Sequence, residues 1–221
     1  MKRHRLPAPP RTWAAAGLSL VLVLLAAAAP AGATTLRRMD LPELVGRAHR
    51  VVRARAVDRQ VYWNAEGTRI YTDTTFEVLD EAKGHGPGRL TVSLLGGRID
   101  PAVMIVDGTP EFHVGEEVVL FTSPRPDGKQ NLVGFSQGVM RVREDPATGA
   151  KFVAGEVPVG VRFVETRGGA PVAVPGESLR APLDAFMKEV RAIASGAKGA
   201  GGGIEMTPQR PTTLEQGGSP R

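Results

Sequence analysis

Histidines are the first residues of this chain that could bind a metal or transfer protons. Outside the N-terminal 33 residues they are His49, His85 and His113. Zinc sites usually draw ligands from short, regular spacings such as His-Glu-x-x-His, and none of the three lies in such a motif. The sequence therefore predicts neither a metal nor any other cofactor. A metal held by His85 and His113 with distant carboxylates is kept only within an alternative, hydrolytic function.

A serine could act as a nucleophile in the string Gly-Phe-Ser-Gln-Gly at residues 134–138. This string places Ser136 in the pattern of a nucleophile elbow, which requires a strand before the serine and a helix directly after it. Residues 139–143 instead alternate as in a strand. We therefore interpret the string as a bend between strands and predict no catalytic residue. A hydrolase that uses Ser136 is the alternative from the enzyme class.

Aromatic and basic side chains near one predicted turn give the strongest binding signal. They are Arg53, Arg55, Arg59, Tyr62, Trp63 and Tyr71. Such a surface on a small barrel could stack nucleic acid bases. The interpretation that we favour is that the arginines pair across strands with Asp73 and Glu77.

The overall charge also argues against nucleic acid as a partner. The full chain has a net charge of +5. Removal of residues 1–33 takes away four of the 28 basic residues and no acidic one, which leaves 24 basic against 23 acidic residues. A nearly neutral protein lacks the electrostatic attraction that nonspecific nucleic acid binding requires.

A long connection at residues 98–115 is the second candidate for binding, because loops of this length in compact domains are often functional. It begins at Arg98, contains an apolar run at residues 102–106, and ends near an aromatic residue and a histidine. Together with the hairpin tip it supplies the predicted ligand-binding residues, which are Tyr62, Trp63, Tyr71, Arg98, Phe112 and His113.

The elements that must position these residues are predominantly strands. Residues 50–63 and 69–80 alternate as two long strands, and Asn64-Ala65-Glu66-Gly67 supplies turn residues between them. Each arm is about twice the usual strand length of ~5–6 residues, so we expect the hairpin to twist and curl into a small barrel. The predicted fold is mostly β: a curled antiparallel barrel of five to seven strands, similar to an oligonucleotide/oligosaccharide-binding (OB) barrel.

Two helices and a tail complete the predicted architecture. A short helix is expected at residues 39–48, and a longer one at 182–193 has apolar residues on one face. Residues 167–177 are expected to form a loop. Residues 195–221 are rich in Gly, Pro, Thr and Ser, so we expect a disordered tail after a β-barrel domain at 34–194.

The first 33 residues have the composition of an export signal. A basic stretch precedes an apolar run, and Ala31-Gly32-Ala33 fits the cleavage pattern. The apolar run is shorter than the ~20 residues that span a membrane, so we expect no stable membrane anchor after cleavage. The chain has no cysteine, which excludes disulfides and thiol chemistry. The sequence thus predicts an exported protein, periplasmic or extracellular, stabilised by its core.

Several stretches, taken in order, resemble a family of uncharacterised exported bacterial proteins whose members usually have Asp in place of His49. They are LPELVGRAHRVV at residues 41–52, Tyr71-Thr72, Glu77-Val78, Lys83-Gly84, GTPEF at 108–112, GEEVVLF at 115–121 and GFSQG at 134–138. The resemblance implies an OB-type barrel and carries no activity.

The function expected from these observations is that of a non-enzymatic binding or structural module of the bacterial envelope. Its partner would be an envelope or extracellular protein or a glycan, and not nucleic acid. Protease inhibition is a weaker hypothesis, because inhibitors of similar barrel type use a segment tethered by a disulfide.

Overall fold

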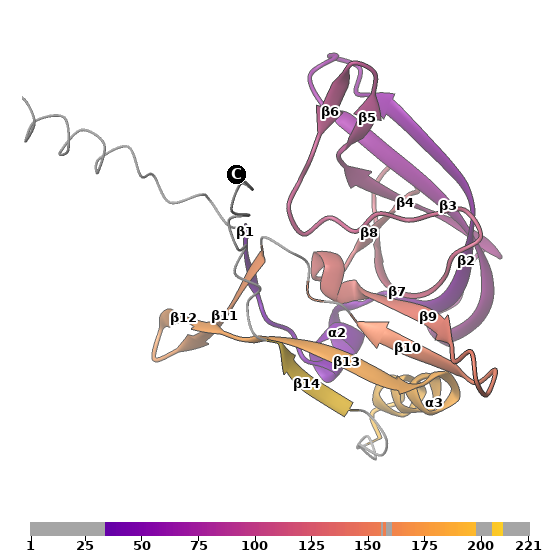
Figure 1. The fold of residues 1–221 in the computed structure, drawn as a ribbon, viewed down its shortest axis with the longest axis vertical. Coiled ribbons are helices and arrows are strands. Elements are labelled where there is room, and N and C mark those ends of the chain that lie inside the picture. The colour runs from indigo at the N-terminus through magenta and orange to yellow at the C-terminus, as the bar shows by residue number, and fades with distance from the viewer. Residues whose placement is uncertain (1–33, 156, 158–160, 198–204, 210–221) are drawn as a thin grey trace, which may run out of the picture. The chain divides into compact units, whose positions relative to one another are not determined.

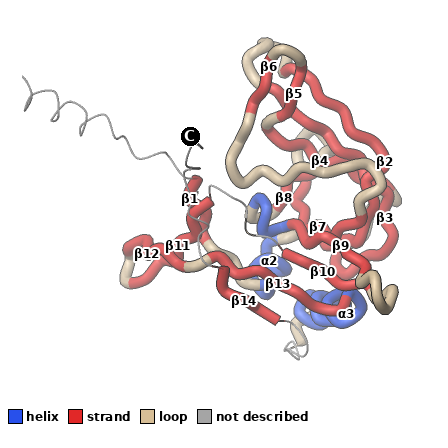
Figure 2. Tube along the Cα trace, viewed as in Figure 1, coloured by secondary structure: helices blue, strands red, loops and turns tan. Residues whose placement is uncertain are grey.

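The computed structural model describes residues 34–155, 157, 161–197 and 205–209 (Figure 1). The predicted export signal at residues 1–33 lies outside the described residues. The described part is mostly β, with a closed five-stranded barrel, further strands and two helices, as predicted. Figure 2 shows both helices at the end of the barrel away from β5 and β6.

The barrel consists of β2 (Arg50–Trp63), β3 (Ile70–Lys83), β4 (Arg89–Leu95), β7 (Glu117–Pro124) and β8 (Gln130–Leu132). The strands are paired in the order β7-β2-β3-β4-β8, and β8 closes the ring by pairing with β7. All pairings are antiparallel except that of β4 with β8. This small closed sheet with one parallel pair is the OB-like barrel that the sequence predicts.

The predicted curl of the β2–β3 hairpin comes from irregular pairing. Its register shifts at three points, between Val51 and Val52, between Arg53 and Ala54, and between Ala56 and Asp58. A bulge bends the strand and increases its twist, so three bulges let two 14-residue strands wrap around a small core. The predicted strand bounds were correct for β2, whereas β3 runs three residues beyond the predicted end.

The sheet continues beyond the barrel through β9 (Val139–Glu144), β10 (Lys151–Gly155), β13 (Gly176–Pro182) and β14 (Glu205–Gln209). A second sheet contains β1 (Thr34–Arg37), β11 (Val161–Arg167) and β12 (Ala170–Val174), and a small hairpin contains β5 (Gly97–Ile99) and β6 (Ala102–Met104). The expectation of a loop at 167–177 was wrong, because most of that range belongs to β12 and the start of β13.

Part of the predicted disordered tail is a strand. Residues 205–209 form β14, which pairs antiparallel with β13. Composition could not reveal this strand, because an open strand edge binds another strand through backbone groups and needs no large apolar side chains. Residues 198–204 and 210–221 lie outside the described residues.

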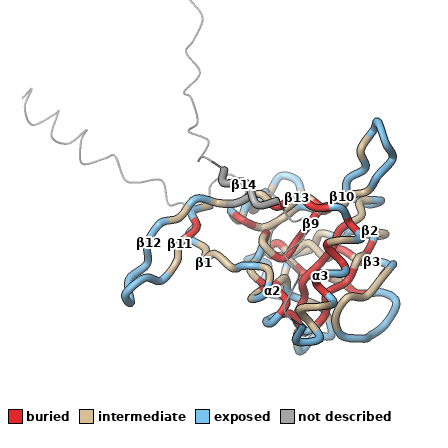
Figure 3. The backbone as a smooth tube through the Cα atoms, turned by 90° about the horizontal axis from the view of Figure 1, so that it is seen from below, coloured by how far each residue is buried: buried red, intermediate tan, exposed pale blue. Residues whose placement is uncertain are grey.

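The two predicted helices are present as α2 (Leu41–Arg47) and α3 (Leu183–Ala194). The Asp40 side chain caps α2 by accepting a hydrogen bond of 2.8 Å from the Glu43 amide. The apolar face of α3 is buried against the sheet, where the Phe186 and Phe121 rings are 6.4 Å apart. Figure 3 shows the buried segments concentrated where β2, β3, β9 and α3 meet.

A buried arginine explains the glycine-rich turn between β3 and β4. The Arg50 side chain is only 5% exposed; it is ion-paired with Glu81 and donates a 3.3 Å hydrogen bond to the Pro87 carbonyl. A Cβ at Gly84, where φ is 71°, would lie 2.5 Å from the His49 carbonyl oxygen, and one at Gly86 would lie 2.7 Å from Arg50 Nη1, so glycines let the turn pass close to Arg50. His85 Nδ1 lies 3.1 Å from Glu81 Oε2, so His85 of the turn contacts the same carboxylate as Arg50.

The Arg50–Glu81 pair should make stability depend on pH. Burial by itself would raise the pKa of the Glu81 carboxyl, but hydrogen bonds from Arg50 and His85 outweigh it and the pKa is lowered. A lowered carboxyl pKa contributes stability that is present above the unfolded value of ~4.3 and is lost as pH falls through the folded value.

We predict that Glu81→Gln lowers the free energy of unfolding at pH 7 by about 3 kcal/mol, because it leaves the Arg50 charge buried without its carboxylate. The loss should shrink as the pH falls below the unfolded value of about 4.3 and disappear once the folded carboxyl is also protonated. Urea unfolding between pH 3 and 7 measures both effects. Glu77→Gln, at an exposed position of the same strand, is the control; equal losses in the two variants would contradict the prediction.

Candidate functional site

The mouth of the barrel holds a cavity of about 570 Å³ between the sheet and the connection from β4 to β7. Thr72 and Thr74 of β3 and Leu94 of β4 line it from the sheet, and residues 103–106 line it from the connection. In Figure 1 this connection carries the β5–β6 hairpin at the same end of the barrel as the β2–β3 turn. Cavities of ~300–1,000 Å³ in barrel mouths are typical of small-molecule sites. We call it the mouth cavity.

Two successive glycines, Gly96 and Gly97, direct the connection across the barrel. Gly97 has a φ of 145°, and a Cβ there would lie 2.7 Å from both Thr72 Oγ1 and Val61 Cγ1. The Thr72 hydroxyl donates a 2.7 Å hydrogen bond to the Gly96 carbonyl, and the Gly96 amide bonds to the Ile70 carbonyl at 2.8 Å. The backbone can therefore approach the hairpin closely only because neither residue has a side chain.

Phe112, one of the predicted ligand-binding residues, is buried. The side chain is 3% exposed and packs edge to face on Phe76, with ring centroids 5.0 Å apart. Burial of a large aromatic ring in the barrel core is favourable relative to its exposure to water, and this holds the end of the connection against the barrel. Phe112 still lines the mouth cavity, so the long loop fills the core with one residue and leaves space beside it.

Two arginines are the basic groups of the mouth cavity. Arg98 was predicted as a binding residue, and its nearest acidic partner is Asp100 at 3.7 Å. Arg59 was named in the arginine row but not among the predicted ligand-binding residues; it lies 3.6 Å from Glu111. A bulge at Val57 brings Arg59 beside Thr74 on the inner face of the hairpin, and simple alternation could not predict that switch. The apolar run at 102–106 was the sequence signal for the part of the cavity wall that the connection supplies.

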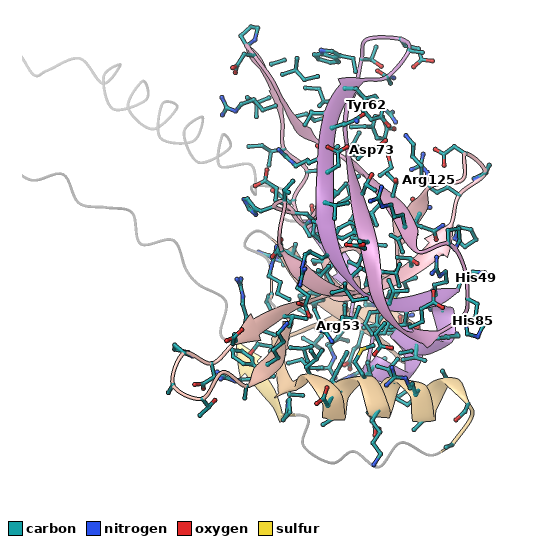
Figure 4. All side chains as sticks on the ribbon, turned by 90° about the vertical axis from the view of Figure 1, so that its right-hand side faces the viewer. His49, Arg53, Tyr62, Asp73, His85 and Arg125 are labelled. Atoms are coloured by element: carbon teal, nitrogen blue, oxygen red, sulfur yellow. The ribbon has the colours of Figure 1, made fainter. Side chains whose placement is uncertain are left out.

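The hairpin tyrosines are brought together, but on the outer face of the barrel. Tyr62 and Tyr71 are direct cross-strand partners, with stacked rings 6.1 Å apart. Lys129, just before β8, lies 2.6 Å from Asp73 and 2.9 Å from the Tyr62 hydroxyl. Figure 4 shows Tyr62 and Asp73 on the hairpin with Arg125 of the β7–β8 turn beside them. The hydrogen bonds that Lys129 donates to Asp73 and Tyr62 raise the Lys129 pKa, so this polar clasp binds the hairpin to β8.

Trp63 and His113 are not brought together with the tyrosines. Trp63 pairs with Ile70 and has the opposite orientation to Tyr62, because neighbours along a strand face opposite sides. His113 is exposed and borders a separate, highly charged groove with Glu116, Glu117 and Lys151. Sequence analysis thus placed residues of three different surfaces in one predicted site.

The arginine row of β2 forms ion pairs, as the favoured interpretation held, but with other partners than those predicted. Arg53 donates a 2.5 Å hydrogen bond to Glu117 of β7, and Lys151 donates one of 2.9 Å to the same carboxylate. Burial would raise the Glu117 pKa, but these hydrogen bonds outweigh it and the pKa is lowered. Asp73 is bound by Lys129 instead. These charges stabilise the pairing of β2 with β7 and join β10 to β7.

Ser136 has no catalytic surroundings among the described residues. It is buried, and its Oγ has no hydrogen-bond partner there, whereas a serine nucleophile needs a base within hydrogen-bond reach. A four-residue 3-10 helix (Phe135–Gly138) and then β9 follow Gly134, in agreement with a bend rather than an elbow. Within the described ranges, no group of three His, Asp or Glu side chains is arranged to bind a metal, including at His85 and His113.

Comparisons with known proteins leave the site to be judged from its geometry. No protein-family model matches the chain, and no curated protein matches it. The resemblance to exported bacterial proteins therefore stays a prediction that rests on the quoted residues. In the part of the chain that the structure describes, neither helix has the length and hydrophobicity needed to cross a membrane.

We predict that Gly97→Ala displaces the β5–β6 hairpin from the mouth cavity. The new methyl group would contact Val61 and Thr72 at a backbone conformation that strains any L residue, so we expect a loss of stability of about 2 kcal/mol. Hydrogen exchange at residues 98–106 should accelerate. The control is Gly67→Ala in the β2–β3 turn, where φ is also positive but a Cβ has no neighbour within 4 Å; we expect a loss of about 1 kcal/mol there. Unchanged exchange at residues 98–106 would contradict the prediction.

Proposed function

We propose that this protein is an exported, non-enzymatic binding module that holds a small ligand in the mouth cavity. The observation that carries the proposal is the cavity itself, which is walled by the barrel sheet on one side and by the long connection on the other. Its size suits a small molecule, and its lining combines apolar side chains with threonines, two arginines and a glutamate that could orient a ligand.

The composition of the cavity wall supports binding rather than catalysis. Among the described residues that line it there is no His, Ser, Lys or Tyr, which are types that commonly act as nucleophiles or proton carriers. The one carboxylate is Glu111, which is 76% exposed and faces Arg59.

Export is supported by the sequence and is compatible with the described fold. The predicted cleavage between Ala33 and Thr34 would leave β1 whole, because β1 begins at Thr34 and pairs with Val161 of β11. A fold without cysteine needs no oxidant outside the cytoplasm. An envelope protein or glycan as partner stays a prediction, because the aromatic residues expected to bind it lie on different faces.

Ligand binding by the mouth cavity can be tested directly. We expect the mature protein to bind the neutral fluorescent probe N-phenyl-1-naphthylamine saturably and at about one site per chain. The double variant Val103→Asp, Ile105→Asp should bind it at least about tenfold more weakly, because two exposed apolar side chains of the cavity wall become charged. Fluorescence titration measures both affinities.

Val114→Asp is the matched control for this experiment. Val114 is an equally exposed apolar residue of the same connection, but it does not line the mouth cavity. Its variant should bind the probe as wild type does. Fluorescence that rises without saturation, or that weakens equally in both variants, would overturn the proposed function.

A further prediction concerns processing. When the full chain is produced in a Gram-negative bacterium, the protein released from the periplasm should begin at Thr34, as determined by mass spectrometry of its N-terminal peptide. Ala33→Lys should accumulate as the uncleaved chain, because the cleavage pattern requires a small residue there, whereas Thr35→Lys should be cleaved normally. A full-length wild-type chain confined to the cytoplasm would exclude export.

A further inference from the structure

We infer that the ligand of the mouth cavity is a single-chain amphiphile with an anionic head group, such as a medium-chain carboxylate. The inference rests on the proposed function and adds the chemical class of the ligand. It follows from three features of the cavity, which are its apolar wall, its two arginines and the weakness of their present ion pairs.

The apolar wall provides a continuous surface for a hydrocarbon chain. Residues 103–106 from the connection face Leu94 and Leu95 from the end of β4, with Phe112 at the junction with the barrel core. Val103 and Ile105 are among the exposed large hydrophobic residues, at 47% and 82%. Burial of an alkyl chain against this wall contributes about 0.8 kcal/mol for each CH₂ group removed from water.

The two arginines have donors to offer to an anion. Arg98 lies 3.7 Å from Asp100 and Arg59 lies 3.6 Å from Glu111, and both distances exceed that of a hydrogen bond. Both carboxylates are mostly exposed, at 86% and 76%, so water competes strongly for these ion pairs. A guanidinium carries five N–H donors and binds carboxylates in a bidentate manner, so each arginine can bind an anionic head group.

Other ligand classes fit less well. A cation would meet Arg59 and Arg98 against only Glu111 among the wall residues. A glycan would lie against the apolar residues 103–106, and the Thr72 hydroxyl, which could bind it, already donates to the Gly96 carbonyl. The cavity volume of about 570 Å³ suits one small ligand, which favours a free single-chain molecule over a lipid within a bilayer.

The test is displacement of N-phenyl-1-naphthylamine by decanoate and by 1-decanol, which share a chain length and differ in head-group charge. We expect wild type to bind decanoate about tenfold more tightly than decanol, as charge-assisted hydrogen bonds predict. Arg98→Gln and Arg59→Gln should each reduce this preference to less than about threefold and leave decanol affinity unchanged. Arg89→Gln, at an exposed position of β4 outside the cavity wall, is the control and should retain the preference.

The outcomes separate this inference from the proposed function. If the probe binds and decanoate shows no preference over decanol, or if neither cavity arginine affects that preference, the inference is wrong and the binding module stands. If the probe does not bind at all, both are wrong. Cosedimentation with phosphatidylglycerol vesicles distinguishes a lipid head group from a free amphiphile; association with vesicles without displacement by decanoate would also overturn the inference.

Discussion

Closure of the barrel through β8 is the constraint on which the rest of the structure depends. β8 has only three residues; it forms three residue pairs with β7 but only the Val92–Gln130 pair with β4. One bridge is a weak seam for a closed sheet, and the clasp of Lys129 with Asp73 and Tyr62 strengthens it from the hairpin side. The mouth cavity needs this closure, because β3 and β4 face the long connection only when the sheet is curled.

The strand β7 connects the barrel with the rest of the sheet. It pairs with β8 near one end and with β9 near the other, and its two faces contribute to different cores. Its end at Thr122 pairs with β8, whereas Leu120 and its neighbours pair with β9, so the sheet leaves the barrel along this strand. Val118 and Leu120 belong to the barrel core, and Val119 and Phe121 to the core beneath the helices. The unbroken apolar run that predicted a strand buried on both faces thus has its physical cause in two separate cores.

The local patterns of the sequence predicted the barrel and both helices, but not β12, β14 or which side chains meet. The lengths of the hairpin arms were enough to predict a curl, since no small domain can cover a straight ribbon of that length. The site was harder to predict from the sequence, because it depends on bulges and on tertiary burial. Phe112 lies in the predicted long loop, and its packing on Phe76 in the barrel core is a tertiary contact that the loop sequence does not reveal. Likewise, the close approach of Gly84 and Gly86 to Arg50 does not follow from the turn sequence.

The bulge at Val57 shows how one extra residue can create a binding site. Before it, Ala56 of β2 faces the core opposite Phe76; after it, Arg59 faces inward opposite Thr74. Without the extra residue, the inward positions would pass to Gln60 and Tyr62, because a shift of one residue exchanges the two faces of a strand. The same bulge therefore places Tyr62 outside, where it joins the clasp that closes the barrel, and a cationic group inside at the mouth. The Tyr62 contact that strengthens barrel closure and the cationic group of the mouth cavity thus both depend on this one irregularity in β2.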